Sequence, residues 1–307
     1  MNFRRSDFDV SNRINTTDPV CVKLEVARIY RGLYHVESTA LNRAFDDLCR
    51  LYFGEYPGYT RCDTHYHDLQ HVMDVTLAMA RLVDGYERSR GDGPHIEREL
   101  FVLGIVCALF HDCGYIRRAN DTRHANGAAY TTTHVTRGGK FLKGYLPEIG
   151  LGRWAEAAPQ VLHYTGYERR VETIRIADPM LRLLGSLLGS ADIIAQMADR
   201  CYLEKCRDRL YPEFVEGGIT HKKTVKGEVV VFASAEDLLR KTPSFYQNAT
   251  RRLESDLGGA YKYASAHFGG QNLYMEAVQQ NIRWVERSTA GPSGEIPLRR
   301  VPPVTIN

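Results

Sequence analysis

Four side chains in two short stretches of the sequence are of the types that bind divalent metal ions. His67 and His71 are four residues apart, so on a helix they would lie about 40° from each other and face one cleft. His111 and Asp112 follow the apolar run 100–110, where a carboxylate is costly unless a cation accompanies it. Imidazole with carboxylate suits Zn, Fe and Mn, and with water Mg. These residues therefore predict a metal site.

Asp192 is a further candidate ligand. It continues the apolar stripe of Leu181, Leu184 and Leu188, so its carboxylate should point where the leucines point and needs a partner inside. Any one such His or Asp is more often a hydrogen-bonded core residue than a ligand. The order His, then His-Asp, then Asp, each within an apolar helix, favours a shared metal over separate core roles.

The elements that must position these residues are expected to be helices. Apolar residues recur at helical spacing through most of the chain. This spacing predicts helices over residues 22–33, 41–52, 66–83, 97–112, 121–143, 178–199, 235–257 and 273–285. The prediction is one all-α domain at 21–287, between flexible arms at 1–20 and 288–307. The stretch 217–232 is the one place where a short hairpin or ordered loop is expected.

Composition narrows the class of protein further. The 307 residues are 43% hydrophobic and 25% charged, and the formal net charge is +3, so no strong field is expected to draw the chain onto nucleic acid or a membrane. No apolar run approaches the length of a membrane span, and the N-terminus is polar. Seven cysteines without a paired spacing fit a reducing compartment. The expectation is a cytoplasmic protein; a homodimer remains open.

Three segments resemble a known superfamily. Residues 66–75, YHDLQHVMDV, resemble the cyclic-nucleotide phosphodiesterase pattern Y-H-N-x-x-H-A-x-D-V, departing at Asp68 and Met73 among others. Residues 108–112, ALFHD, look like the motif that names the HD superfamily of metal-dependent phosphohydrolases, and residues 190–192, SAD, are similar to the segment with its last aspartate ligand. The resemblance covers about residues 60–216 and implies a single HD-type helical domain.

The resemblance also implies roles for individual residues. His71, His111, Asp112 and Asp192 would hold the tighter metal, with Asp112 bridging to a second ion, and His67 would protonate the leaving oxygen. These roles are also reasonable on chemical grounds alone, because a metal lowers the pKa of bound water to near neutral and a positioned imidazole can protonate a departing alkoxide. The expected function is hydrolysis of a small-molecule phosphoester, best a cyclic or other nucleotide phosphodiester, with one or two Zn, Mn, Fe or Mg ions per chain.

The chain departs from the phosphodiesterases after the HD motif, where Cys113 begins a segment that lacks their further histidine. The second ion would then need another imidazole. His124 and His163 are the favoured candidates. His134 is ranked below them, because His124 and His134 would lie about 80° apart on one helix, so that only one enters the site.

Arg117 is expected to contact the substrate, since guanidinium binds phosphate through paired hydrogen bonds. The resemblance to the phosphodiesterases also implies that Gln247 stands where their purine-binding glutamine stands. Two other functions stay open. An HD-type di-iron oxygenase would need two more histidines from among those named above. A regulatory HD module would bind a nucleotide without cleaving it, although such a module has no need of the full ligand set.

Overall fold

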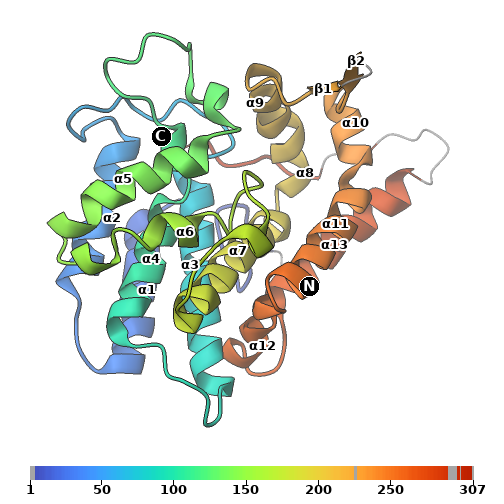
Figure 1. Ribbon diagram of the computed structural model, residues 1–307. Coiled ribbons are helices and arrows are strands. Elements are labelled where there is room, and N and C mark those ends of the chain that lie inside the picture. Colours follow the sequence, from blue (N-terminus) through green and yellow to red (C-terminus); the bar gives the residue numbers. More distant parts are fainter. Residues whose placement is uncertain (1–3, 225–226, 290–295, 298, 306–307) are drawn as a thin grey trace.

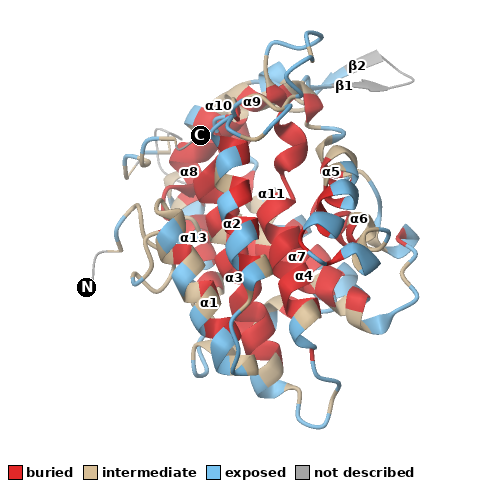
Figure 2. Ribbon diagram, turned by 90° about the vertical axis from the view of Figure 1, so that its left-hand side faces the viewer, coloured by how far each residue is buried: buried red, intermediate tan, exposed pale blue. Residues whose placement is uncertain are grey.

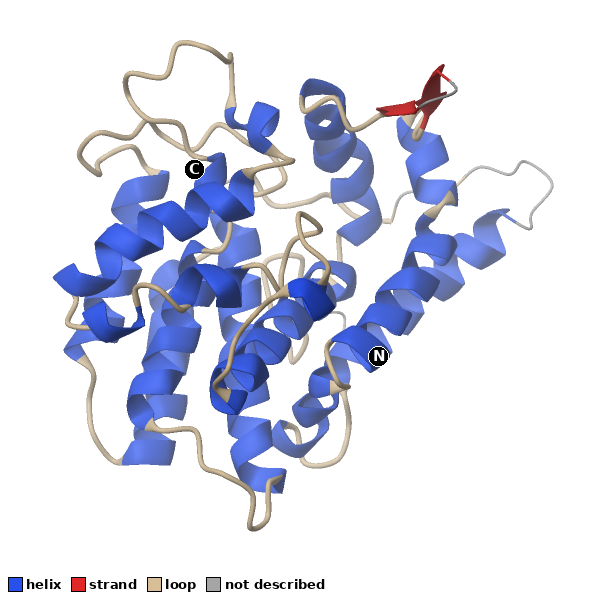
Figure 3. Cartoon of the chain, in the orientation of Figure 1, coloured by secondary structure: helices blue, strands red, loops and turns tan. Residues whose placement is uncertain are grey.

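The computed structural model describes residues 4–224, 227–289, 296–297 and 299–305, with the backbone alone for 222–224 and 227–228. Apart from one short hairpin, the described elements are helical, as Figure 3 shows. The all-α prediction is confirmed. The parts of the predicted arms at 1–3, 290–295, 298 and 306–307 lie outside the described residues.

Figure 1 shows how the helices are arranged. The α-helices of the described chain are α1 Pro19–Tyr34, α2 Thr39–Tyr52, α3 Leu69–Ser89, α4 Arg98–Phe110, α5 His134–Glu148, α6 Ala158–Leu162, α7 Pro179–Ala198, α8 Tyr202–Lys205, α9 Tyr211–Glu216, α10 Ala235–Arg240, α11 Thr242–Arg251, α12 Tyr263–His267 and α13 Leu273–Thr289. Tighter or wider turns join them at η1 Cys113–Tyr115, η2 Gly127–Tyr130, η3 Gly152–Trp154, η4 Val171–Thr173, η5 Cys206–Leu210, η6 Arg252–Asp256 and η7 Ala260–Lys262.

The core forms around α3, α4 and α7. Helix α3 packs against α1, α4, α7 and α12, and α4 is buried on all sides from Leu100 to Phe110, as Figure 2 shows. A helix without a polar face can be stable only inside such a bundle, so its position follows from its composition. No helix among the described residues has both the length and the apolar character needed to cross a membrane.

The hairpin expected within residues 217–232 is present. Strand β1, His221–Thr224, pairs antiparallel with β2, Gly227–Val230. The two residues of its turn lie outside the described part. The hairpin projects from the end of the bundle beside α9 and α10 (Figure 1).

The helix predicted over residues 235–257 is divided into α10, α11 and η6, and two predicted helix starts near the candidate site are wrong. The helix expected from residue 121 begins at His134, because the Asp121 carboxylate accepts hydrogen bonds from Arg123 and Tyr130 within a loop. The helix expected from residue 66 begins at Leu69, because Asp68 caps it: the Asp68 Oδ1 atom accepts from the His71 amide at 2.9 Å. His67 therefore lies just ahead of α3.

Part of the predicted N-terminal arm is packed against the helices. Asp9 is buried, and its carboxylate pairs with Arg81 of α3 at 2.6 Å and accepts from the amides of Arg13 and Ile14. Burial raises the pKa of Asp9, but Arg81 and these hydrogen bonds outweigh that effect and hold the pKa well below its usual range. This pair ties residues 4–18 to the core.

We expect Asp9→Ala to destabilise the protein by about 3–5 kcal/mol, because it leaves the buried Arg81 guanidinium without its charge partner. Since the pKa of Asp9 is lower in the folded protein than in the unfolded chain, its contribution is present above about pH 4 and disappears as the pH falls through the folded value. Urea unfolding at pH 7 and at acid pH measures both effects. The control Asp46→Ala, at a carboxylate 67% exposed, should change stability by less than about 1 kcal/mol.

Candidate metal centre

Four of the predicted ligands converge at one point of the bundle. The His71 Nε2 atom is 3.3 Å from Asp112 Oδ2 and 3.6 Å from Asp192 Oδ1. The His111 Nε2 atom is 3.1 Å and 3.8 Å from the same two oxygens. Ligand atoms each about 2.0–2.2 Å from one ion lie roughly 3.0–3.6 Å apart. The spacing matches a shared metal ion.

Three helices bring these ligands together. His71 lies in the first turn of α3, His111 and Asp112 follow the last residue of α4, and Asp192 lies in the C-terminal half of α7. Asp178 caps the last of these helices, since its carboxylate accepts from the Met180 amide at 2.7 Å. Because α3 packs on both α4 and α7, the ligands meet inside the core.

Two of the candidate donor atoms are buried without a hydrogen-bond partner among the described residues. His111 Nδ1 is 2.8 Å from the Ala108 carbonyl, so this nitrogen donates to the backbone and Nε2 is the nitrogen that faces the cluster. His111 Nε2 and Asp112 Oδ2 are buried without a hydrogen bond within the described structure. Such atoms are costly unless something binds them. His71, His111 and Asp112 thus form a buried group able to hold a metal ion.

The electrostatics of the cluster favour a cation. Burial lowers the pKa of His111, but the carboxylates of Asp112 and Asp192 outweigh burial and raise it to about 9. Burial likewise raises the pKa of Asp112, and the neighbouring His111 and His67 imidazoles reverse this and hold it well below its usual range. A proton is retained where a metal would bind, because the two carboxylates need a positive charge.

His134, ranked below the other two extra histidines, is the one that reaches the centre. Its Nε2 atom is 3.6 Å from Asp112 Oδ1, on the side away from His71 and His111, and its Nδ1 is 2.8 Å from the Thr131 carbonyl. Burial lowers the pKa of His134, which favours the neutral ring that a metal requires. Gly114 permits this approach, because a Cβ atom there would lie 1.8 Å from the His134 carbonyl oxygen.

The two favoured histidines do not reach the centre. His124 is exposed on the loop before α5, with its ring against Tyr130. His163 is buried at the end of α6, its Nδ1 has no hydrogen bond in the described structure, and it does not line the cavity above the metal cluster. The ranking of His124 above His134 was wrong because the helix predicted from residue 121 begins only at His134, which leaves His124 on the preceding loop. The ligand set of a di-iron oxygenase is accordingly not assembled among the described residues.

His67 is held beside the ligands by a residue that the sequence analysis missed. Its Nδ1 lies 2.6 Å from Glu213 Oε2, and its ring stacks on Tyr115 at 4.3 Å. Burial lowers the pKa of His67, but Glu213 and then Asp112 reverse this and raise it. A protonated imidazole close to neutral pH suits a proton donor. No local pattern identifies Glu213, which is 146 residues away in the chain.

A cavity of about 450 Å³ opens above the cluster. His67, His71, Asp112, His134 and Asp192 form its polar end. The rest of its wall is mainly apolar and comes from η5, α9, α10, α11 and the segments around the hairpin, through Leu210, Phe214, Ile219, Phe232, Leu238 and Phe245. The cavity can therefore hold an organic group next to the metal ligands.

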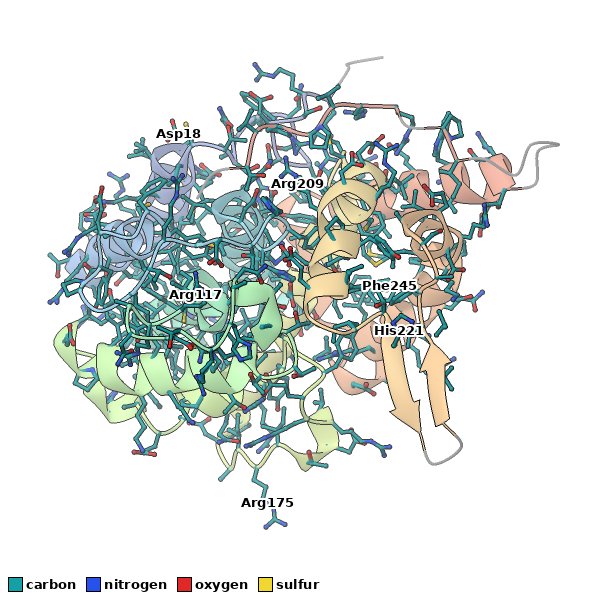
Figure 4. The ribbon with its side chains drawn as sticks, turned by 90° about the horizontal axis from the view of Figure 1, so that it is seen from above. Asp18, Arg117, Arg175, Arg209, His221 and Phe245 are labelled. Atoms are coloured by element: carbon teal, nitrogen blue, oxygen red, sulfur yellow. The ribbon has the colours of Figure 1, made fainter. Side chains whose placement is uncertain are left out.

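The two predicted substrate contacts lie elsewhere. The Arg117 guanidinium binds Asp63 Oδ2 at 2.8 Å and the His124 carbonyl at 3.0 Å, outside the cavity, and Figure 4 shows it well apart from Phe245. Gln247 is exposed on α11 and does not line the cavity. Arg117 was misassigned because it already has an acidic partner that is distant in sequence, which leaves it unavailable for phosphate.

Comparisons with known proteins identify no relative of this chain. No family model matches the chain, and neither a curated protein nor a solved structure is similar enough to count as a match.

Proposed function

We propose that this protein is an HD-type, metal-dependent hydrolase of phosphoesters. One observation carries the proposal: four side chains of metal-binding type converge at one end of the cavity, beside the His67–Glu213 pair, and two of them have buried donor atoms without a hydrogen bond in the described structure. Phosphoester hydrolysis needs both a metal site and a proton donor. A purely regulatory module would need neither the convergent ligands nor a paired His67.

His71, His111, Asp112 and Asp192 would hold the ion, which supplies a charge for the phosphoryl oxygens and an ionised water as nucleophile. Glu213 accepts the Nδ1 proton of His67 and so keeps the proton on Nε2 available for the leaving oxygen. Tyr115 supports the ring from one face. His67 thus protonates the departing alcohol, and Glu213 stabilises the charged ring before that step.

The cavity supports an organic phosphoester with few charges as the substrate. Lys241 supplies the one ammonium or guanidinium group among the described lining residues, and its ammonium already binds Asp237 at 2.8 Å and the Val231 carbonyl at 2.7 Å. A triphosphate chain would lack cationic partners there. The apolar wall suits a base or another flat group. We therefore propose a nucleotide phosphodiester, cyclic or linear, as the substrate class.

A panel assay tests this function. Metal-free protein reloaded with Zn, Mn, Fe or Mg would be given bis(p-nitrophenyl) phosphate, cyclic nucleotides, dinucleotides and nucleoside triphosphates. We expect metal-dependent hydrolysis of the diesters and little cleavage of triphosphates. His124→Ala, at an exposed imidazole, serves as the control and should match the wild type. Tight metal binding with no turnover of any ester would contradict the proposal.

The position of His134 leads to a prediction about stoichiometry. Asp112 has one oxygen toward His71 and His111 and the other toward His134, as a bridging carboxylate does in a two-metal site. The wild type dialysed against Mn should then hold about two ions per chain, and His134→Ala about one. Elemental analysis measures both. His163→Ala, at a buried histidine outside the cavity, should keep the wild-type content; a single ion in the wild type would contradict the bridge.

A further inference from the structure

A row of buried charges lies behind the proton donor. Helix α8, the π-helical turn η5 and α9 form one continuous helical segment over residues 202–216. Cys206, Leu210 and Phe214 recur every four residues along it and line the cavity. The residues that immediately precede them, Lys205, Arg209 and Glu213, recur with the same spacing and are buried. This second row is charged and faces the start of α3.

Each member of the charged row binds a different residue at the start of α3. Lys205 Nζ donates to the Gln70 side chain at 3.0 Å, and Arg209 Nη1 donates to Asp68 Oδ2 at 3.1 Å. Glu213 accepts from the His67 amide as well as from its ring. The contacts run in opposite directions along the two segments. The row therefore clamps the stretch that carries His67, together with Asp68, whose carboxylate caps the turn of His71.

The C-terminal segment 299–305 holds this helical segment from its other side. Glu204 is buried, and its Oε1 atom accepts from the amides of Arg299 and Arg300 at 2.7 Å and 3.1 Å. Arg209 donates to the Pro303 carbonyl through Nη2, the second arm of its guanidinium. Arg209 is thus shared between the C-terminal segment and Asp68. Figure 4 labels it where the segment 202–216 meets α3.

We propose that Arg209 is a positioning residue, through which the C-terminal segment 299–305 holds His67 in place for proton transfer. The proposal rests on the proposed hydrolysis, in which His67 is the donor. Asp68 has two oxygens: one caps the His71 amide, and the other binds Arg209. Loss of Arg209 would free the residue next to His67, while the ligands on α4 and α7 stay where their own helices place them.

The expected effect is on the rate with poor leaving groups. A displacement of about 1 Å at a reacting group can lower a rate about a hundredfold. We expect Arg209→Ala to lower kcat about 10- to 100-fold for an alkyl or nucleoside ester, and much less for a p-nitrophenyl ester, whose leaving group needs no proton. Arg209→Lys keeps one donor and should fall between Arg209→Ala and the wild type.

Two controls separate positioning from general damage. Arg207→Ala removes an arginine from the same helical segment, where it pairs with Asp208 at the surface, and should leave both substrates unaffected. A chain ending at residue 298 should show the same leaving-group dependence as Arg209→Ala, with partial recovery when a peptide of residues 299–307 is added. Metal content should stay close to that of the wild type in all of these proteins.

Hydrogen exchange tests the clamp without any turnover. In Arg209→Ala and in the shortened chain, the amides of residues 66, 67 and 71 within the stretch 66–71 should exchange at least about tenfold faster, because their acceptors on Glu213 and Asp68 are no longer held, whereas α4 should keep its protection. Unchanged exchange at 66–71, equal rate losses on both esters, or loss of metal would each overturn the proposal. If no ester is cleaved by the wild type, the proposed function fails, and the exchange result still decides whether the clamp exists.

Discussion

Asp112→Asn is expected to remove both metal binding and hydrolysis. The Asp112 carboxylate lies within 3.6 Å of three imidazoles: its Oδ2 atom faces His71 and His111, and its Oδ1 atom faces His134. The amide keeps the shape of the side chain but has no negative charge and only one oxygen. A bound metal lowers the activation barrier by several kcal/mol, so we expect its loss to reduce the rate about a thousandfold or more.

The fold should survive this substitution. Burial of the Asp112 charge is costly, and an isosteric neutral amide leaves no space in the core. Elemental analysis, circular dichroism and the ester assay should be run on the same preparation. Asp121→Asn, nine residues further along on the loop outside the cavity, is the matched control and should retain metal and rate. Wild-type metal content in Asp112→Asn would contradict the ligand assignment.

His67→Gln should retain metal and lose rate in a way that depends on the leaving group. The His67 ring is bound to Glu213 rather than to any of the ligand carboxylates, so the cluster of His71, His111 and Asp112 does not need it. General acid catalysis contributes about a hundred- to ten-thousandfold, and we expect the loss to lie in this range for alkyl and nucleoside esters. It should shrink sharply for p-nitrophenyl esters.

Glu213→Gln tests the same pair from its other side. Without the carboxylate, the charged form of the His67 ring is less stable, so kcat for poor leaving groups should fall, but by less than in His67→Gln. His65→Gln, at an exposed histidine two residues upstream, is the control and should leave metal and rate unchanged. If His67→Gln lowered the rate equally for both classes of ester, His67 would not be the proton donor.

The sequence alone was enough to predict the fold class, the place of a short hairpin or ordered loop, and the four candidate ligands that the structure brings together. A helix that is apolar on every side, such as 98–110, must be buried, and a His-Asp pair at its end must then find a cation or partners. Asp192 on the leucine stripe of α7 follows from the same periodicity. These conclusions need only the identity and spacing of nearby residues, which is why they could be read from the chain.

Only the tertiary structure decided which other residues join the site. His134 reaches Asp112 because α5 begins there, after a loop in which Asp121 is bound by Arg123 and Tyr130 instead of capping a helix. Arg117 and Glu213 have partners 54 and 146 residues away, and such pairings depend on how helices pack rather than on local pattern. Local propensity sets where helices can form; competition between distant partners decides where they end and what they face.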